Sequence, residues 1–255
     1  MRHDLSVVIV TICRQALLHA VRSIYQQKFS GRIQVLIGVD YDPFQNKESL
    51  HATLREECPA NITLTWLDLG YSTSRRHGGP HASFYGGSLR PALTFLADSE
   101  IVMYLDDDDW LSEEHCSSIL QAIAGKKWAF AYSIYADGNT RQGLCIDELE
   151  SVGVNRGFYA KKLGGFVRPS GLAVNKLQLM AIHHLWAIPA FPTGDGEDRL
   201  VFDLLRREPH GCTGKATVFC AIDPKDDLHA MRVSFMQSKG VKFTINEKPE
   251  SSRFH

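Results

Sequence analysis

The chain has 255 residues, 44% of them hydrophobic and 22% charged, which suits one large globular domain with a sizeable core. Its 28 basic and 29 acidic residues give a formal net charge of −1, so neither nucleic acid nor an anionic membrane is favoured as the main electrostatic partner. No apolar run approaches the roughly 18 to 20 residues that cross a bilayer.

The six cysteines are scattered and form no C-x-x-C pair, so the sequence offers no zinc ribbon or redox motif. The short apolar run near the N-terminus lacks a small-residue cleavage site, and this favours a buried strand over a signal peptide. We therefore expect a cytoplasmic protein with reduced thiols and no transmembrane segment, for which peripheral contact with a membrane stays open.

The first part of the chain alternates strand and helix patterns. Residues 5–12 are a continuous β-branched run, typical of a strand covered on both faces. Residues 14–28 place leucine, valine and isoleucine side chains on one helical face, and residues 33–39 form a second buried strand. This order predicts a β-α-β unit with parallel strands. A helix at 47–57 and a strand at 62–67 extend it.

Residues 70–88 interrupt this alternation. The sequence GYSTSRRHGGPHASFYGGS has no periodicity and predicts a long functional loop. Its basic side chains are candidates to close over a diphosphate: Arg75, Arg76, His77 and His81. Beyond the loop, helices are predicted at 89–97, 111–124, 177–184 and 198–207, and strands at 101–105, 128–135 and 216–222. Residues 236–255 are predicted to form a weakly ordered tail.

Four aspartates, Asp106 to Asp109, directly follow the predicted strand 101–105. Ligands of open parallel sheets gather at the carboxyl ends of the strands. Crowded carboxylates repel one another unless a cation or hydrogen-bond donors compensate, and Mg²⁺ and Mn²⁺ prefer oxygen ligands together with phosphate. The run therefore indicates a metal or phosphate site. The alternative is a solvated charge run at the start of the following helix.

The segment LDDDDWL resembles the D-x-D segment of family 2 glycosyltransferases with the GT-A fold. The resemblance implies that Asp108 coordinates a divalent metal, Mn²⁺ or Mg²⁺, which bridges the diphosphate of a nucleotide-sugar donor. It also implies that Asp106 contacts the ribose or a metal-bound water. Asp107 occupies the variable middle position on the donor side, and Asp109 follows as a supporting charge.

Three further segments match the donor side of this family. The opening strand SVVIVTICR is similar to the family's first strand and places Thr11 and Arg14 at the edge of the nucleotide site. Asp40 matches the aspartate that binds the base, with a turn-initiating aspartate as the alternative. Arg90 matches the arginine of an Ala-Arg-Asn segment, although Pro91 replaces the asparagine. A diphosphate contact by Arg90 competes with an ordinary surface position.

Two segments match the acceptor side and the metal shell. GDGEDRL resembles the family's Glu-Asp segment at the start of a helix, which implies that Asp198 deprotonates the acceptor hydroxyl and that Glu197 positions the acceptor or the helix. The alternative is an ordinary pair of acids at a helix N-terminus. His229 is similar to a histidine on a C-terminal loop that completes the metal shell in some family members, with an exposed histidine as the alternative.

Together these features predict an α/β fold of the GT-A type, a single domain with a Rossmann-like, mostly parallel central sheet flanked by helices. Residues 1–110 are expected to form the nucleotide-sugar-binding half and residues 111–235 the acceptor-binding half. The resemblance implies an inverting, metal-dependent transfer of a sugar from a UDP-linked donor to a hydroxyl of a carbohydrate or lipid-linked acceptor, in the synthesis of surface polysaccharides or glycoconjugates. The chain lacks a Q-x-x-R-W element, which favours transfer of a single sugar over processive synthesis.

Two other functions stay open at this level. A sugar-nucleotide nucleotidyltransferase also combines a Rossmann-like sheet with metal-binding aspartates, but it usually carries a glycine-rich phosphate loop after the first strand, which TICRQALLHA lacks. A catalytically silent protein that binds nucleotide sugars would keep the same fold. A dehydrogenase is disfavoured because no G-x-G-x-x-G follows the first strand.

Overall fold

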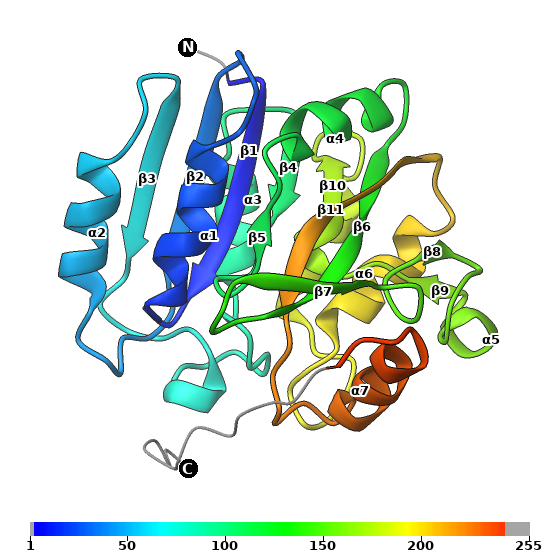
Figure 1. Cartoon of the computed structure of the whole chain (residues 1–255). Helices are drawn as coiled ribbons and strands as arrows, with labels where there is room; N and C mark the ends of the chain where they lie inside the picture. Colours follow the sequence, from blue (N-terminus) through cyan, green and yellow to red (C-terminus); the bar gives the residue numbers. More distant parts are fainter. Residues whose placement is uncertain (1–2, 243–255) are drawn as a thin grey trace.

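In the computed structural model, which describes residues 3–242, a large curled sheet is flanked by helices (Figure 1). Within these residues the sheet has nine strands. Their spatial order is β3 (Ile62–Asp68), β2 (Ile33–Val39), β1 (Leu5–Thr11), β4 (Ile101–Tyr104), β10 (Leu172–Asn175), β6 (Trp128–Asp137), β11 (His210–Ala221) and β5 (Trp110–Leu111), while β7 (Gln142–Ile146) pairs with β6.

The helices connect these strands. The α-helices are α1 (Ala16–Tyr25), α2 (Lys47–Glu56), α3 (Leu89–Leu96), α4 (His115–Ile123), α5 (Ala160–Leu163), α6 (Glu197–Leu205) and α7 (His229–Ser238). Short 3₁₀ helices are η1 (Arg75–His77), η2 (Pro169–Gly171) and η3 (Met180–Ala187). In the part of the chain that is described, no helix has both the length and the apolar character that spanning a bilayer requires.

The sheet is parallel in its first part and mixed beyond it. β1 pairs in parallel with β2 and with β4, and β2 pairs in parallel with β3. β10 then lies antiparallel to both β4 and β6. In the parallel part Thr11 is opposite Val39, and Val8 is opposite Tyr104. The strands therefore deliver Thr11, Asp40 and Asp106 to the same edge of the sheet, where parallel sheets bind ligands.

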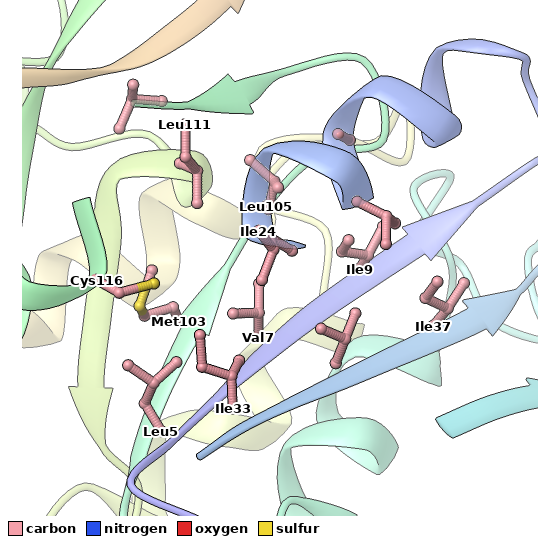
Figure 2. Packing of buried hydrophobic residues seen from close by; sticks show 14 of the residues in the cluster. Leu5, Val7, Ile9, Ile24, Ile33, Ile37, Met103, Leu105, Leu111 and Cys116 are labelled. Atoms are coloured by element: carbon pink, nitrogen blue, oxygen red, sulfur yellow. The ribbon is translucent and has the colours of Figure 1, made fainter. Parts of the chain in front are cut away.

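Alternate residues of β1 face the two sides of the sheet, which explains why most of its residues are apolar. Leu5, Val7 and Ile9 face a cluster formed with α1, α4 and the residues of β2 on the same face of the sheet, as Figure 2 shows. Val8 faces a second cluster, on the other side of the sheet, with residues of α3, η3 and α6. A strand with helices on both faces buries nearly all its side chains, so apolar residues predominate in it. The buried Ser6 is an exception, and its hydroxyl lies in hydrogen bonds with Gln34 and Ser99.

A small two-stranded sheet lies outside the main one. β8 (Gly153–Val154) and β9 (Gly165–Phe166) pair only with each other and enclose α5. Figure 1 shows this unit at the edge of the molecule opposite α2. We call residues 153–166 the arm.

Several predicted boundaries change for identifiable reasons. The helix predicted at 111–124 begins only at His115, because Trp110 and Leu111 pair with β11 instead. The Trp110 ring stacks on Phe219 of that strand with the ring centroids 5.4 Å apart. Residues 180–187 form a 3₁₀ helix where an α-helix was predicted at 177–184. Residues 236–238 of the predicted tail end α7, and residues 243–255 lie outside the described residues.

Candidate functional site

The acidic run leaves the end of β4 and folds back on itself. The backbone N–H of Asp109 donates to the carbonyl of Asp106 at 3.2 Å, which closes a tight turn over the four residues. As a result the four carboxylates diverge, and each reaches a different set of partners. The side chains of Asp107 and Asp109 are buried, while those of Asp106 and Asp108 are 37% and 36% exposed.

The β1–α1 connection supplies partners for the middle of the run. Thr11 donates its hydroxyl to Oδ2 of Asp107 at 2.6 Å. Arg14 pairs with Oδ1 of Asp107 and donates from Nη1 to Oδ2 of Asp108 at 3.0 Å. Cys13, between them, adopts a left-handed backbone with φ 60°, which turns the chain sharply at this point. Thr11 and Arg14 thus lie beside the acidic run, as expected for residues of one site.

Burial and neighbouring charge raise the pKa of two carboxyl groups in the run. The pKa of Asp108 rises to about 8, mainly through burial and the charge of Asp109, although Arg14 opposes the shift. The pKa of Asp109 rises to about 6, again through burial first and then through Asp106. Arg14 therefore does not offset all the negative charge of the acidic run. Residual negative charge of this kind favours a bound cation.

Arg90 connects the run to the second acidic segment. It lies at the start of α3, is 6% exposed, and donates to Oδ1 of Asp106 at 2.8 Å. On its other side Nη1 lies 3.9 Å from Oε1 of Glu197. Its guanidinium also sits over the Trp186 ring, 4.9 Å from the centroid. A single buried cation therefore holds two acidic segments together that are far apart in the sequence.

Glu197 and Asp198 begin α6, directly after Gly196, which has φ 81°. A Cβ at Gly196 would lie 2.7 Å from the Phe191 ring, so both the backbone and the packing require glycine. Burial raises the pKa of Glu197 to about 7, with Arg90 opposing the shift. Burial also raises the pKa of Asp198. The charges of Arg90 and Asp106 act on Asp198, so it belongs to the same electrostatic site.

Ser170 is a site residue that the sequence analysis missed. Its hydroxyl donates to Oδ2 of Asp109 at 2.6 Å and accepts from the backbone N–H of Asp106 at 3.1 Å. Ser170 lies in η2, just before β10, and it reaches the run because β10 inserts next to β4. A lone serine in the sequence RPSG carries no signal for this position.

A second set of charges, next to Ser170, was also missed. We call it the inner network, and its members are Tyr135, Asp147, Glu150, Arg168 and Arg232. Arg232 of α7 donates to both oxygens of Glu150, at 2.6 and 2.9 Å. The Tyr135 hydroxyl lies 2.6 Å from Oε1 of Glu150. The inner network therefore anchors α7 to the sheet.

Asp40 lies at the same edge of the sheet, but it contacts the loop 70–88 rather than the acidic run. Its Oδ1 accepts from the Ser72 hydroxyl at 3.0 Å and from the Thr73 backbone N–H at 3.2 Å. Its Oδ2 is buried without a hydrogen-bond partner among the described residues. The next residue, Tyr41, stacks on His77 of the loop with centroids 4.4 Å apart. The loop is thus fixed over the end of β2.

The carboxylates fit a divalent metal that is shared with a phosphate. Among the described residues there is no group of three or more His, Cys, Asp or Glu side chains placed to hold a metal ion. Oδ1 of Asp108 accepts no hydrogen bond from the described residues, and the side chain is partly exposed. Mg²⁺ and Mn²⁺ commonly bind through one or two carboxylates together with substrate phosphates. Asp108, with Asp106 beside it, offers this arrangement.

His229, predicted as a further metal ligand, is the first residue of α7 and not part of a flexible loop. Its backbone N–H donates to the carbonyl of Asp226 at 2.8 Å, and its Nδ1 is buried without a partner among the described residues. No contact joins it to the acidic run within those residues. Its role in a metal shell stays a prediction.

Comparison with solved structures identifies the fold of this chain, whereas comparison with protein families and curated sequences finds no match. No protein-family model matches the chain, and no curated protein sequence matches it. Several solved structures share its architecture, among them TarS from S. aureus, with a TM-score of 0.59 and 16% identity over 94% of this chain and 40% of that one. The predicted α/β fold class is confirmed.

Two of the similar structures contain nucleotide sugars. TarS 1–349 in complex with UDP-GlcNAc has a TM-score of 0.58 and 15% identity over 88% of this chain and 60% of that one. The mannosyltransferase PcManGT from Pyrobaculum calidifontis, in complex with GDP-Man and Mn²⁺, has a TM-score of 0.57 and 16% identity over 94% of this chain and 64% of that one. The present chain is therefore similar to a part of each longer protein.

Proposed function

We propose that this protein is an inverting glycosyltransferase of the family 2 type, which moves a single sugar from a UDP-linked donor to an acceptor hydroxyl with the help of Mn²⁺ or Mg²⁺. One observation carries the proposal. Arg90 lies 2.8 Å from Asp106 and 3.9 Å from Glu197, so it joins the acidic run to the start of α6. A donor-binding and an acceptor-binding segment must meet in this way for transfer between two bound substrates.

On the donor side, Asp108 and Asp106 would hold the metal and the diphosphate, and Thr11, Arg14 and Asp107 would form the floor beside them. When bound, the metal supplies positive charge that offsets the charge developing on the leaving diphosphate. Arg14 is 42% exposed, so its guanidinium can also meet phosphate oxygens without leaving the site. Asp40 would accept a hydrogen bond from the base, through the oxygen that lacks a partner among the described residues.

On the acceptor side, Asp198 would remove the proton of the attacking hydroxyl. Burial raises the pKa of its carboxyl group, which makes the carboxylate a stronger base than an exposed aspartate. Glu197 has its pKa near 7 and is 4% exposed, which suits a residue that positions the acceptor through a hydrogen bond. The acceptor oxygen would form the new bond to the anomeric carbon while its proton passes to Asp198. The diphosphate would leave with the electron pair of the broken bond between its oxygen and the anomeric carbon.

The similar structures support the choice of donor class. TarS has been solved with UDP-GlcNAc and with UDP, and PcManGT with GDP-Man and Mn²⁺. The fold that the present chain shares with them places its own carboxylates at the edge of the parallel strands. We assign a carbohydrate or lipid-linked acceptor to the half of the chain that follows residue 110, which contains Glu197 and Asp198.

Thermal stability in the presence of nucleotide sugars tests the donor site. We expect a UDP-sugar with Mn²⁺ to raise the melting temperature more than GDP-, dTDP- or CMP-sugars do, since ligand at about 100 times its Kd stabilises the folded state by about 2.7 kcal/mol. Asp108→Asn should lose the part of this stabilisation that depends on Mn²⁺. Asp223→Asn, at an exposed carboxylate in the loop after β11, is the matched control. If no nucleotide stabilises the protein with either metal, the donor site is not where we place it.

A further inference from the structure

The balanced net charge of the chain conceals a region without acidic residues. From Ser151 to Gly194 the sequence contains no Asp or Glu, although acidic and basic residues are nearly equal in number over the whole chain. The arm lies at the start of this region. Its cations are Arg156, Lys161 and Lys162, and all three are exposed.

None of these three cations is in an ion pair with the described residues. Arg156 donates from Nη1 to the Tyr132 hydroxyl at 2.8 Å and lies over that ring, and this contact leaves its charge uncompensated. The nearest acids before the arm in sequence are already engaged, Glu148 with Lys239 and Glu150 with Arg232. The arm therefore presents positive charge to solvent.

The end of α6 adds to this charge. A Cβ at Gly164 would lie 2.9 Å from Nη1 of Arg206, so the Arg206 guanidinium packs directly against the arm. Arg206 and Arg207 share a single carboxylate, Asp203, at 2.7 Å each. One negative charge between two arginines leaves a net positive charge beside the arm.

An exposed aromatic ring lies in the same segment of the chain as the cations of the arm. Phe158 is 57% exposed, while its neighbour Tyr159 is 7% exposed and packs on Phe166 with centroids 5.7 Å apart. The buried pair anchors the arm in the second core cluster, and Phe158 is left outside it. An exposed apolar ring on the same short unit as three exposed cations matches the interface of a bilayer, where the ring enters the headgroup region and the cations meet anionic lipids.

The shape of the arm is fixed by its backbone. Gly157 and Gly165 have φ values of 72° and 99°, and a Cβ at Gly165 would lie 2.1 Å from the carbonyl oxygen of Gly153. The Asn155 backbone N–H donates to the carbonyl of Gly164 at 2.7 Å. Phe158 and the two lysines are thus held on one rigid support, which lowers the entropy cost of docking.

We propose that the arm is a docking surface for anionic lipid bilayers, with Phe158 as the apolar anchor and Arg156, Lys161 and Lys162 as the electrostatic contacts. The overall charge of −1 does not oppose this, because surface electrostatics act over about 10 Å at ordinary ionic strength, and three acids near the arm are already paired: Glu148 with Lys239, Glu150 with Arg232 and Asp203 with Arg206. The arm also adjoins the acceptor end, since Arg199, next to Asp198, lies over the Tyr159 ring at 5.2 Å. If the proposed function holds, a docked bilayer would therefore border the acceptor site.

Vesicle sedimentation in the absence of donor and acceptor tests the docking surface. The full chain should bind vesicles of phosphatidylcholine with about 30% phosphatidylglycerol, and not vesicles of phosphatidylcholine alone. Phe158→Ser, and the double variant Lys161→Gln with Lys162→Gln, should each bind the anionic vesicles at least about fivefold more weakly. Unchanged melting temperatures would establish that these variants fold normally.

Matched controls lie on other elements. Phe44→Ser removes another exposed aromatic ring, 46% exposed, and Arg55→Gln with Lys126→Gln removes two exposed cations. These variants should bind vesicles like the original protein. Equal binding by the arm variants and the controls would overturn the proposal. Tight binding of soluble polyphosphate, with no effect of Phe158→Ser on vesicles, would also overturn it and assign the arm to a soluble polyanion.

The same variants separate this inference from the proposed function. Donor hydrolysis without acceptor should proceed at the original rate in Phe158→Ser, because the arm makes no contact with the acidic run among the described residues. Vesicle binding without hydrolysis in any variant would leave the docking surface intact and contradict the glycosyltransferase proposal. Donor hydrolysis without vesicle binding in the original protein would support the glycosyltransferase proposal and contradict the docking surface.

Discussion

Glu150 and Glu197 are both almost completely buried, at 2% and 4% exposure, and both face an arginine. Their pKa values nevertheless shift in opposite directions. Burial alone would raise the pKa of Glu150, but two hydrogen bonds from Arg232, at 2.6 and 2.9 Å, together with Arg168, lower it below the ordinary value. Burial raises the pKa of Glu197 to about 7, because Arg90 is 3.9 Å away and is also shared with Asp106.

The difference separates the inner network, whose charges are closely paired, from the proposed functional site. In the inner network nearly every charge has a close, well-oriented partner, so the network can rigidify the junction of α7 with the sheet. At the acidic run and the start of α6, carboxylates outnumber the arginines that contact them. The pKa values of four of these carboxyl groups rise, those of Asp108, Asp109, Glu197 and Asp198. Groups with raised pKa values at a strand end are typical of sites that bind cations or move protons.

The largest effect is expected at the proposed base. Asp198→Asn keeps the size of the side chain and removes its ability to accept a proton, so transfer should fall by about 10² to 10⁴-fold. Binding of the UDP-sugar with Mn²⁺ should stay within about twofold, because Asp198 is assigned to the acceptor side. Steady-state transfer and donor titration measure the two quantities.

Asp203→Asn on the same helix is the control for that variant. Its carboxylate is 44% exposed and pairs with Arg206 and Arg207, away from the acidic run. It should transfer sugar at the original rate. If Asp198→Asn kept the original activity, Asp198 would not be the base. Glu197 and Asp198 would then be ordinary acidic residues at a helix N-terminus.

In the inner network the main effect should be on stability. Glu150→Gln removes the carboxylate that Arg232 contacts with two hydrogen bonds and leaves only Asp226 with Arg232 and Asp147 with Arg168. Loss of one partner of a buried ion pair costs about 3 to 5 kcal/mol, and these remaining carboxylates should hold the loss near the lower end of that range. Chemical denaturation should therefore show a large fall in the free energy of unfolding. The double variant Glu150→Met with Arg232→Met should recover part of the loss, because it buries no unpaired charge. A loss of transfer activity at unchanged stability would instead make the network part of the site.

The pH dependence of stability tests Glu197 directly. The folded state holds this proton up to about pH 7, whereas the unfolded chain releases it near the ordinary value of 4.5. The unfolded state therefore binds fewer protons in this window, and the group makes the protein less stable as pH rises through it. Glu197→Gln should match the original protein below the window and become more stable than it, by about 2 to 3 kcal/mol, above the window.

Denaturation of both proteins at about pH 4 and about pH 8 measures this difference. Glu150→Gln serves as the contrast, because a lowered pKa has the opposite sign: the stability that Glu150 contributes is present above its unfolded pKa and is lost as pH falls. A pH-independent difference between Glu197→Gln and the original protein would show that folding does not raise the pKa of Glu197.

The sequence alone predicts the proposed functional site better than the inner network. Asp106 and Asp108 follow a buried strand, and Asp198 begins a helix after two glycines, so local patterns locate them. The link through Arg90 depends on how α3 and α6 pack, and no local pattern contains it. Ser170 and the inner network depend on β10 inserting antiparallel between β4 and β6, a pairing that joins segments distant in sequence.

The same limit applies to short elements. β5 has two residues, Trp110 and Leu111, and its apolar pattern continues into the next helix, so periodicity assigned it there. Its place in the sheet comes from the stacking of Trp110 on Phe219, which is a long-range contact. The tight pairing of Glu150 with Arg232 is equally remote, because α7 must first fold back onto the sheet.

The smallest effect on stability is expected from Asp203→Asn. Exposed ion pairs contribute little, so the free energy of unfolding should change by less than about 0.5 kcal/mol, and the change should vanish at about 1 M salt. The same substitution removes the one carboxylate that offsets Arg206 and Arg207 beside the arm. It should therefore strengthen binding to anionic vesicles by about two- to fivefold, since one charge near a membrane surface contributes about 1 kcal/mol at most. Unchanged vesicle binding by Asp203→Asn would mean that α6 does not face the bilayer, and the docking surface would then reduce to the arm itself.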